Sequence, residues 1–401
     1  MNAPAFDPAG MWNDIAVDLA RRGYTASAVA ACRRAVDMAP DRADLRSNYG
    51  NMLRRDGRMK EARQELEIAL SLDHRHAPAI FNIGCWWMDS LGPEGALEWI
   101  RIALETDPTN VDWRFAKAAC LLQLGRWPEA FFEYEVRLDR KDYRMSIPLW
   151  KGEDLTDKTL LIHGEQGLGD TIMFARFLRH FREARIAVQP PLVRLMGCEQ
   201  MGEDWPADYR LPIMSIPHRL GLTDVAAAPY IVPTHKLTLP SPPGAKAKVG
   251  LVWKAKTQAE HMTVDERLHG AQKSIPLEKL LELTRLPGVA LFGLQPGVTD
   301  IADIGAQHLV TDLGPRIFDF ADLASFIDQM DVLVSVDTAP AHLAGAMGKP
   351  VVVVCHHAGS WQWGTSDRSV WYEEARIVRQ KEPGIWPVDD IVAEVENALG
   401  S

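Results

Sequence analysis

The first third of the chain repeats itself at a period of 34 residues. Two sets of small residues come into register at this period: Ala28, Ala62, Ala96 and Ala130, together with Ala35, Ala69 and Ala103. Units of this length are typical of stacked helix pairs, because one pair alone cannot bury its apolar face and must pack against its neighbours. The repeat therefore predicts an α-solenoid of four units over residues 9–142.

Glycine and proline positions support the same helix pairs. Three glycines fall at turns between paired helices, where a positive φ ends a helix: Gly23, Gly57 and Gly125. Gly50 and Gly84 fall where two helices approach closely, and Pro40 and Pro108 follow the second helices, which proline cannot continue. This pattern resembles the tetratricopeptide repeat. Solenoid grooves commonly bind extended peptides, so we expect a protein or peptide partner, with a scaffold or dimerisation surface as the alternative.

From Trp150 onward, β-rich runs alternate with amphipathic segments, which is typical of parallel sheets with crossover helices. Six runs are predicted to be strands: Thr159–His163, Arg185–Gln189, Val249–Trp253, Val289–Gln295, Val332–Asp337 and Val351–Cys355. A linker rich in proline and glycine at Leu239–Lys248 divides this region. We therefore expect a first lobe at 150–240, a second lobe at 248–386 and a C-terminal helix at 387–401, with ligands bound at the carboxyl ends of the strands.

Charge, cysteine usage and hydropathy exclude several classes of protein. A formal net charge of −10 disfavours nucleic acid and anionic membranes as partners. The five cysteines are scattered without a C-x-x-C pair, so neither a disulfide framework nor a zinc site is indicated. No apolar run is long enough to span a bilayer, and the N-terminus lacks the pattern of a signal peptide. We expect a cytoplasmic protein without membrane insertion.

The first motif with chemical content is the glycine-rich loop that follows the strand ending at His163. It lacks the G-K-[ST] ending of a P-loop and the spacing G-x-G-x-x-G. Asp170 lies where the loop becomes a helix, so it is either a helix N-cap or a general base at the ligand site. Glu165 is the second candidate carboxylate, with a solvated loop charge as its alternative. The remaining candidates on this acceptor-side loop are Gln166, Gly167 and Gly169.

The second motif, residues 331–355, is predicted to be a strand–helix–strand unit. The free N–H groups at the start of its helix make the turn Asp337-Thr338-Ala339 a candidate anion site for a diphosphate. His342 lies one helical turn after Thr338, so it either donates to a phosphate oxygen or is a partly buried helix histidine. Asp337 is expected to organise the turn or contact a sugar, because repulsion disfavours its contact with phosphate.

Together, G-E-Q-G-L-G-D-T at 164–171 and S-V-D-T-A-P-A-H-L-A-G-A-M-G-K-P at 335–350 resemble bacterial tetratricopeptide-containing glycosyltransferases of the GT-B fold. Their catalytic domain is similar to the lipopolysaccharide heptosyltransferases of glycosyltransferase family 9, and the layout resembles O-GlcNAc transferase. The resemblance implies an α-solenoid followed by an α/β region of two Rossmann-like lobes. It also implies transfer of a sugar from a nucleotide-activated donor to an acceptor hydroxyl, on a protein bound by the repeats.

The resemblance assigns roles to the matching residues. Asp170 matches the general base, and Lys273 matches a basic residue near the leaving phosphate. The donor diphosphate loop is matched by four residues: Asp337, Thr338, Ala339 and His342. Lys254, just after a predicted strand, can share the electrostatic task of Lys273, and Gln295 is a candidate for the donor site. Lysines and helix N–H groups would take the place of a metal at the leaving phosphate, and the D-x-D motif is absent. We therefore expect a transfer that inverts the configuration at the anomeric carbon and uses neither a metal nor a cofactor.

Two departures from the family keep other functions open. The segment 254–272 is unusually polar and carries His261 and His269. His356 and His357 follow Cys355, but adjacent histidines on a strand point to opposite faces, which disfavours a metal site. The alternatives are a non-catalytic scaffold or nucleotide-sugar-binding protein with a degenerate transferase domain, and a heptosyltransferase acting on a glycolipid. The sugar, the nucleotide, the acceptor and the oligomeric state are left open by the sequence.

Overall fold

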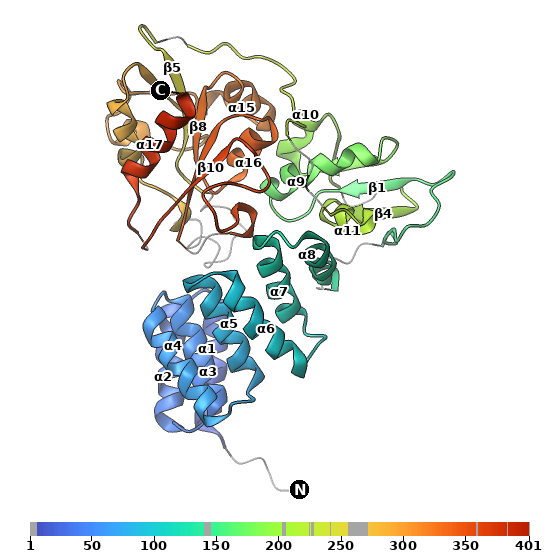
Figure 1. The fold of residues 1–401 in the computed structure, drawn as a ribbon, viewed down its shortest axis with the longest axis vertical. Helices are drawn as coiled ribbons and strands as arrows, with labels where there is room; N and C mark the ends of the chain where they lie inside the picture. The colour runs from blue at the N-terminus through green and yellow to red at the C-terminus, as the bar shows by residue number, and fades with distance from the viewer. Residues whose placement is uncertain are drawn as a thin grey trace. The chain divides into compact units, whose positions relative to one another are not determined.

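The structure is a computed structural model that describes residues 6–139, 146–202, 206–223, 225, 228–240, 242–255, 272–357, 360–382 and 384–400. These residues form two compact units, a helical one within 6–139 and an α/β one within 146–255 and 272–400. Figure 1 labels the helices and strands of both. Repeat helices come first in the chain, and parallel strands alternating with helices follow, which confirms the predicted α + α/β class.

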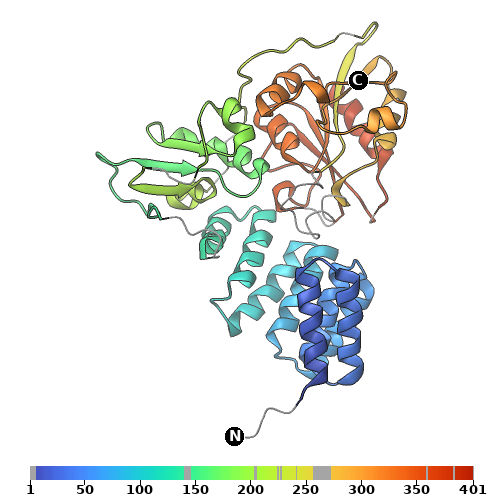
Figure 2. The ribbon, with the colours of Figure 1, turned by 180° about the vertical axis from the view of Figure 1, so that it is seen from behind.

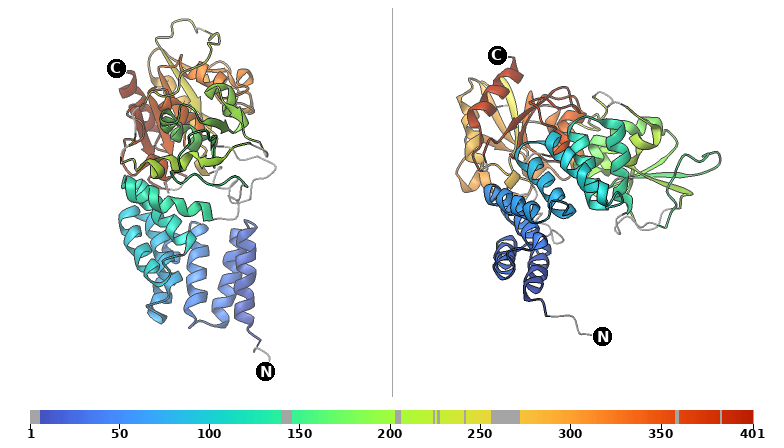
Figure 3. Two further views of the ribbon diagram at one scale, coloured as in Figure 1. Left: turned by 90° about the vertical axis from the view of Figure 1, so that its right-hand side faces the viewer. Right: turned by 60° about the horizontal axis from the view of Figure 1, so that its bottom comes forward.

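The first unit consists of helices that pack in consecutive pairs, α1 on α2, α3 on α4, α5 on α6 and α7 on α8. Their bounds are α1 Pro8–Arg21, α2 Thr25–Met38, α3 Ala43–Arg55, α4 Met59–Leu72, α5 Ala77–Ser90, α6 Pro93–Thr106, α7 Val111–Gln123 and α8 Trp127–Tyr134, followed by the 3₁₀ helix η1 Glu135–Asp139. The helices of each pair run antiparallel and the pairs stack along the unit (Figures 2 and 3).

Small residues let the paired helices approach each other, as the repeat predicts. The seven alanines in register are at most 1% exposed: Ala28, Ala35, Ala62, Ala69, Ala96, Ala103 and Ala130. A Cβ atom on Gly50 would come within 2.6 Å of Leu66 Cγ in the partner helix. The turn glycines Gly23, Gly57 and Gly125 adopt φ of 79°, 80° and 67°. Both predictions for the glycines are therefore confirmed.

Polar contacts 35 residues apart connect the first helices of successive repeats. Asn48 donates to Asn13 Oδ1 over 2.8 Å, and Asn82 donates to the buried Ser47 hydroxyl over 3.0 Å. Arg54 pairs with Asp89 in the next repeat. These contacts satisfy polar groups between helices that the alanine positions bring close together.

The second unit contains two separate parallel sheets. The first has the strand order β3-β2-β1-β4 and the second has the order β10-β9-β8-β5-β6-β7. The strands are β1 Leu160–His163, β2 Arg185–Val188, β3 Glu199–Gln200, β4 Tyr209–Pro212, β5 Ala247–Val252, β6 Val289–Gly293, β7 Val310–Asp312, β8 Val332–Val336, β9 Val351–Cys355 and β10 Ala375–Arg379. The arrows of both sheets can be followed in Figure 1.

Short helices connect the strands of this unit. They are α9 Leu168–Phe174, η3 Ala175–His180, η4 Pro190–Leu192, α10 Val193–Met196, η5 Ile213–Ser215, α11 Ile216–Leu220, α13 Leu277–Leu280, η6 Leu281–Arg285, α14 Asp300–Asp303, η7 Gly314–Arg316, α15 Phe320–Ile327, α16 Ala339–Ala346 and η8 Trp361–Trp363. The last helix, α17 Val388–Leu399, packs on β8, β9 and β10. Buried valines of β5, β8 and β9 belong to the hydrophobic core around the second sheet.

All six predicted strands are present, with ends that differ from the prediction by at most two residues. Sequence reasoning missed β3, β4, β7 and β10. All four are edge strands, where only one neighbour stabilises the strand and the apolar pattern is weak. The strands β3 and β7 are also very short, at two and three residues. Among the helices that the structure describes, none is long and apolar enough to cross a membrane.

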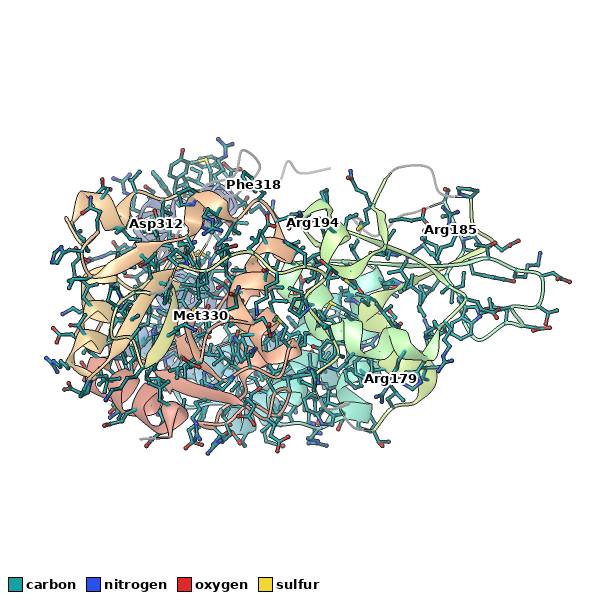
Figure 4. All side chains as sticks on the ribbon, turned by 90° about the horizontal axis from the view of Figure 1, so that it is seen from above. Arg179, Arg185, Arg194, Asp312, Phe318 and Met330 are labelled. Atoms are coloured by element: carbon teal, nitrogen blue, oxygen red, sulfur yellow. The ribbon has the colours of Figure 1, made fainter. Side chains whose placement is uncertain are left out.

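Two groups of contacts join the first sheet's helices to those of the second sheet. Helix α9 packs against α16, and α10 packs against α15. Arg194 of α10 pairs with Asp319 over 2.7 Å and also with Asp322 of α15. Figure 4 shows Arg194 on the side of its sheet that faces α15, while Arg185 lies further out. The carboxyl ends of β1 and β8 are thus held close together through α9 and α16.

Candidate active site

The loop between β1 and α9 has a backbone conformation that needs support from its neighbours. Gln166 adopts φ of 56°, which is unfavourable for a residue with a side chain. Gln189 accepts a hydrogen bond from the Thr171 hydroxyl over 3.0 Å and donates to the Gln166 carbonyl over 3.4 Å. A Cβ atom on Gly164 would lie 2.7 Å from the same Gln189 side chain. Strained backbone of this kind often occurs at functional sites.

Asp170, the predicted base, is half-buried in the first turn of α9. Gly167 is the N-cap of α9, so Asp170 is not the N-cap residue that was one alternative for it; its Oδ2 accepts a hydrogen bond from the Gly167 N–H over 3.0 Å. Its Oδ1 accepts another from Gln362 Nε2 over 3.0 Å. Burial raises the pKa of Asp170, the nearby charges of Glu165 and Asp337 raise it further, and the two hydrogen bonds oppose the rise. A carboxyl with a raised pKa is better suited to accept a proton.

Glu165 is buried, so the alternative that it is a solvated loop charge is wrong. The residue is 6% exposed, and its Oε1 accepts a hydrogen bond from the Met214 N–H over 3.0 Å. It therefore ties the loop to η5, beneath the exposed residues Gln166 and Gly167. The physical reason is that the free N–H groups at the start of η5 need an acceptor.

Asp337 follows β8 and is the centre of a second cluster. Its carboxylate accepts from Trp363 Nε1 over 2.6 Å and from the Ser360 hydroxyl over 3.0 Å, and it pairs with Lys273 over 2.6 Å. Burial alone would raise the pKa of Asp337, but Lys273 and the Trp363 hydrogen bond hold it below its usual value. Asp337 is therefore an ionised carboxylate that organises the turn and neutralises Lys273.

Thr338 and His342 lie on the helix that begins at this turn. Thr338 is the N-cap of α16, but its hydroxyl donates to the Val336 carbonyl over 3.0 Å instead of capping an N–H group. His342 is 3% exposed, stacks on Trp363 with ring centroids 4.5 Å apart, and lies 3.1 Å from the Tyr372 hydroxyl through Nδ1. Burial lowers the pKa of His342 to about 4, so its ring is neutral at neutral pH.

Gly169 connects the two predicted motifs. A Cβ atom on Gly169 would lie 2.7 Å from His342 Cδ2 and 3.5 Å from Ala339 Cα. Only glycine therefore allows the first turn of α9 to rest on the first turn of α16. This contact brings Asp170 beside the half-buried turn at residues 337–340, although the two motifs are far apart in the sequence.

Lys254 and Gln295 come together at the carboxyl ends of β5 and β6. The Lys254 N–H donates to Gln295 Oε1 over 3.0 Å, and Lys254 Nζ pairs with Asp300 at 2.6 Å. Gln295 thus holds the backbone after β5. The contacts of Lys254 described here are with Gln295 and Asp300, at the ends of β5 and β6.

Two side chains of the site were not predicted from the sequence. Arg176 is 2% exposed and donates to the Trp371 carbonyl over 3.0 Å and to the Tyr230 hydroxyl over 3.1 Å. Its guanidinium also lies over the Tyr372 ring, 5.0 Å from the centroid. Gln362 contacts Asp170 as described above. The only sequence signal for Gln362 is its place between the two tryptophans of Trp361-Gln-Trp363.

His356 and His357 lie after the end of β9 and contact each other, so the prediction that they point to opposite faces of a strand is wrong. His356 Nε2 and His357 Nδ1 lie 2.9 Å apart. Within the described ranges, no group of three or more His, Cys, Asp or Glu residues could hold a metal ion. His261 and His269 lie outside the described residues, as does most of the polar segment 254–272.

Comparison with known families identifies two parts of the chain. The family model described as glycosyltransferase family 9 (heptosyltransferase) matches residues 278–379, and a tetratricopeptide-repeat model matches residues 13–77 and 88–142. Protein FlbA of Caulobacter vibrioides is 25% identical over 435 residues, which cover 93% of this chain and 70% of that protein.

Similar solved structures cover about a third of the chain. MamA is 14% identical with a TM-score of 0.28, covering 34% of this chain and 80% of that one. PilF of Pseudomonas aeruginosa is 20% identical with a TM-score of 0.30, covering 34% of this chain and 62% of that one. The two family models alone indicate tetratricopeptide repeats over 13–77 and 88–142 and a glycosyltransferase family 9 domain over 278–379, which supports glycosyltransferase activity in general.

Proposed function

We propose that this chain is an inverting, metal-independent glycosyltransferase that moves a sugar from a nucleotide-activated donor to a hydroxyl of a protein or peptide bound by the repeats. The contact of Gly169 with Ala339 and His342 carries this proposal, because it sets the candidate base beside the candidate donor turn. An attack on a sugar needs a proton acceptor and a site for the leaving phosphate within one small region.

Asp170 would act as the general base. Its carboxylate would take the proton of the acceptor hydroxyl while that oxygen forms a bond to the anomeric carbon. The bond between the anomeric carbon and the phosphate oxygen would break, and its electron pair would leave with the nucleotide. Attack from the face opposite the leaving group inverts the anomeric configuration. The raised pKa of Asp170 supports this role, since its proton affinity lies closer to neutral pH than that of an ordinary aspartate.

The turn at the start of α16 would receive the donor phosphates. The free N–H groups at a helix N-terminus and the helix dipole both favour an anion there. Lys273 can add hydrogen-bond donors, because its ammonium group has three hydrogens and Asp337 does not require all of them. The Thr338 hydroxyl is already used by the Val336 carbonyl, so the main chain would supply most of the donors.

The acceptor class rests on the repeats. Tetratricopeptide units build extended surfaces that suit proteins and peptides better than lipids. A glycolipid acceptor is the competing possibility, and comparing acceptor classes in a transfer assay separates the two. Transfer to lipid-linked sugars but to no protein or peptide would contradict the protein-acceptor part of the proposal.

A thermal-shift panel of nucleotides and nucleotide sugars, measured without added metal, tests the donor site. A ligand that binds only the folded state raises its melting temperature. Asp170→Asn should then lose turnover while keeping the shift caused by the donor, whereas Glu183→Gln, an exposed carboxyl of the same sheet region, should keep both. Full turnover in Asp170→Asn would refute the base assignment, and no shift with any nucleotide would favour a scaffold.

A further inference from the structure

The 3₁₀ turn Trp361–Trp363 contacts both carboxylates of the candidate site. Trp363 Nε1 donates to Asp337 Oδ1 over 2.6 Å, and Gln362 Nε2 donates to Asp170 Oδ1 over 3.0 Å. Asp170 lies in α9, which follows β1 of the first sheet, and the turn follows β9 of the second sheet. A single turn of the second lobe, which carries the candidate donor turn and is called the donor-side lobe below, therefore contacts the candidate base.

This turn is itself firmly held. Trp363 is fully buried and stacks on His342. Arg379 donates to the carbonyls of Trp363 and Gly364, each over 2.8 Å. Trp361 packs edge-on against Phe174 of α9, with ring centroids 6.5 Å apart. The amide of Gln362 is thus presented to Asp170 by a rigid support, which is what an oriented hydrogen bond requires.

The two hydrogen bonds of Asp170 have different consequences. The bond from the Gly167 N–H lies within the first turn of α9, so it does not depend on where the second sheet and its helices lie. The bond from Gln362 joins the lobe of the first sheet to the lobe of the second sheet, so it exists only while the two lobes are in contact. An N–H donor stabilises the ionised form of a carboxyl group and fixes which oxygen lone pairs remain available.

We propose that Gln362 is a positioning residue that orients Asp170 and keeps it ionised for proton abstraction. This inference rests on the proposed role of Asp170 as the base, and it extends that role to a residue of the opposite lobe. Gln362 does not touch the reacting atoms in this arrangement; it acts through Asp170. Because the donor-side lobe supplies Gln362, the base is fully competent only when the donor turn is next to it.

Other charged groups around Asp170 act in the opposite direction or are already neutralised. Glu165 and Asp337 both raise the pKa of Asp170. Lys273 is paired with Asp337, and His342 on the facing helix is neutral. Arg176, next along from α9, is turned toward the Trp371 carbonyl and the Tyr230 hydroxyl. Among the described side chains, Gln362 is the one whose hydrogen bond favours the ionised form of Asp170.

The pH dependence of kcat/KM tests this role. Gln362→Met keeps the length of the side chain but removes the donor, so the acidic limb of the profile should move up by about one pH unit, and kcat/KM on that limb should fall about tenfold. Arg379→Lys is the matched structural control, because it loosens the same turn without touching Asp170. It should lower activity, if at all, without moving the limb. Gln307→Met, an exposed glutamine, should change neither.

A double-mutant cycle on stability provides a readout that needs no turnover. Urea unfolding at pH 7 is measured for the unsubstituted protein, Asp170→Asn, Gln362→Met and the double variant. We expect the two substitutions to be coupled, with Asp170→Asn more stabilising when Gln362→Met is already present, because the carboxylate has then lost a donor. If the two substitutions are coupled in stability but the unsubstituted protein transfers no sugar, the contact between Gln362 and Asp170 is supported and the proposed function is refuted. Additive effects, or a limb that Gln362→Met leaves in place, would overturn the inference.

Discussion

The contact between Gly169 and α16 makes a quantitative prediction for Gly169→Ala. The new Cβ atom would lie 2.7 Å from His342 Cδ2 and 3.3 Å from its Nε2. His342 has little room to move, because its ring stacks on Trp363 and meets the Tyr372 hydroxyl. Overpacking of this kind costs about 1–3 kcal/mol. Alanine recovers roughly 0.5–1 kcal/mol through its better helix propensity, which leaves a net loss of stability of about 1 kcal/mol at the middle of both ranges.

The predicted loss can be measured by calorimetry on the full chain. For an α/β unit of this size, it corresponds to a fall in Tm of roughly 2–4 °C. We also expect kcat to fall, because separating α9 from α16 moves Asp170 away from the donor turn. The double variant with His342→Ser should recover part of the lost stability relative to the sum of the single variants, since the smaller side chain leaves space for the Cβ atom. Unchanged Tm and kcat in Gly169→Ala would refute the close packing of the two helices.

Two further predictions concern the carboxylates. Because the folded pKa of Asp170 is raised above its ordinary value of 3.8, the ionised group destabilises the folded state increasingly as the pH rises from 3.8 through the folded pKa. Asp170→Asn should therefore be more stable than the unsubstituted protein at neutral pH, with a difference that vanishes at pH values below 3.8, as measured by urea unfolding across pH. Lys273→Met should destabilise the α/β unit by about 3 kcal/mol, since it leaves Asp337 buried without its cation. The double variant with Asp337→Asn should regain much of this loss in a chemical denaturation curve, and an undiminished loss would contradict the pairing.

The sequence was sufficient to predict the features that depend on local pattern. The alanine and glycine register predicted the repeat helices, because close helix packing tolerates only small residues at those positions. The loop before Asp170 and the helix at Ala339 were predictable from glycine, proline and capping chemistry. The loop and helix signals each lie within a few residues, and the repeat signal recurs along the chain, so a single sequence contains them.

Arg176 shows why the rest was not predictable. An arginine after a buried helix is expected in solvent, yet this one is 2% exposed. Its burial is possible because the Trp371 carbonyl, 195 residues later, and aromatic faces of the other lobe satisfy the guanidinium. Glu165 was similarly placed in solvent as one alternative, and its actual acceptor role for Met214 depends on a fold contact that no local pattern encodes.

The two carboxylates of the site lie in contrasting environments, and the contrast bears on their roles. Both Asp170 and Asp337 lose hydration to surrounding protein atoms, which by itself raises the pKa of each. Asp337 has a cation at 2.6 Å, so its pKa falls below the usual value, and its proton affinity is too low for efficient base catalysis. Asp170 has only neutral donors and two neighbouring negative charges, so its pKa rises. Two carboxyl groups whose environments shift their pKa values in opposite directions commonly have different roles in catalysis. The contrast supports Asp170 as the proton acceptor and Asp337 as the residue that holds Lys273 and the donor turn in place.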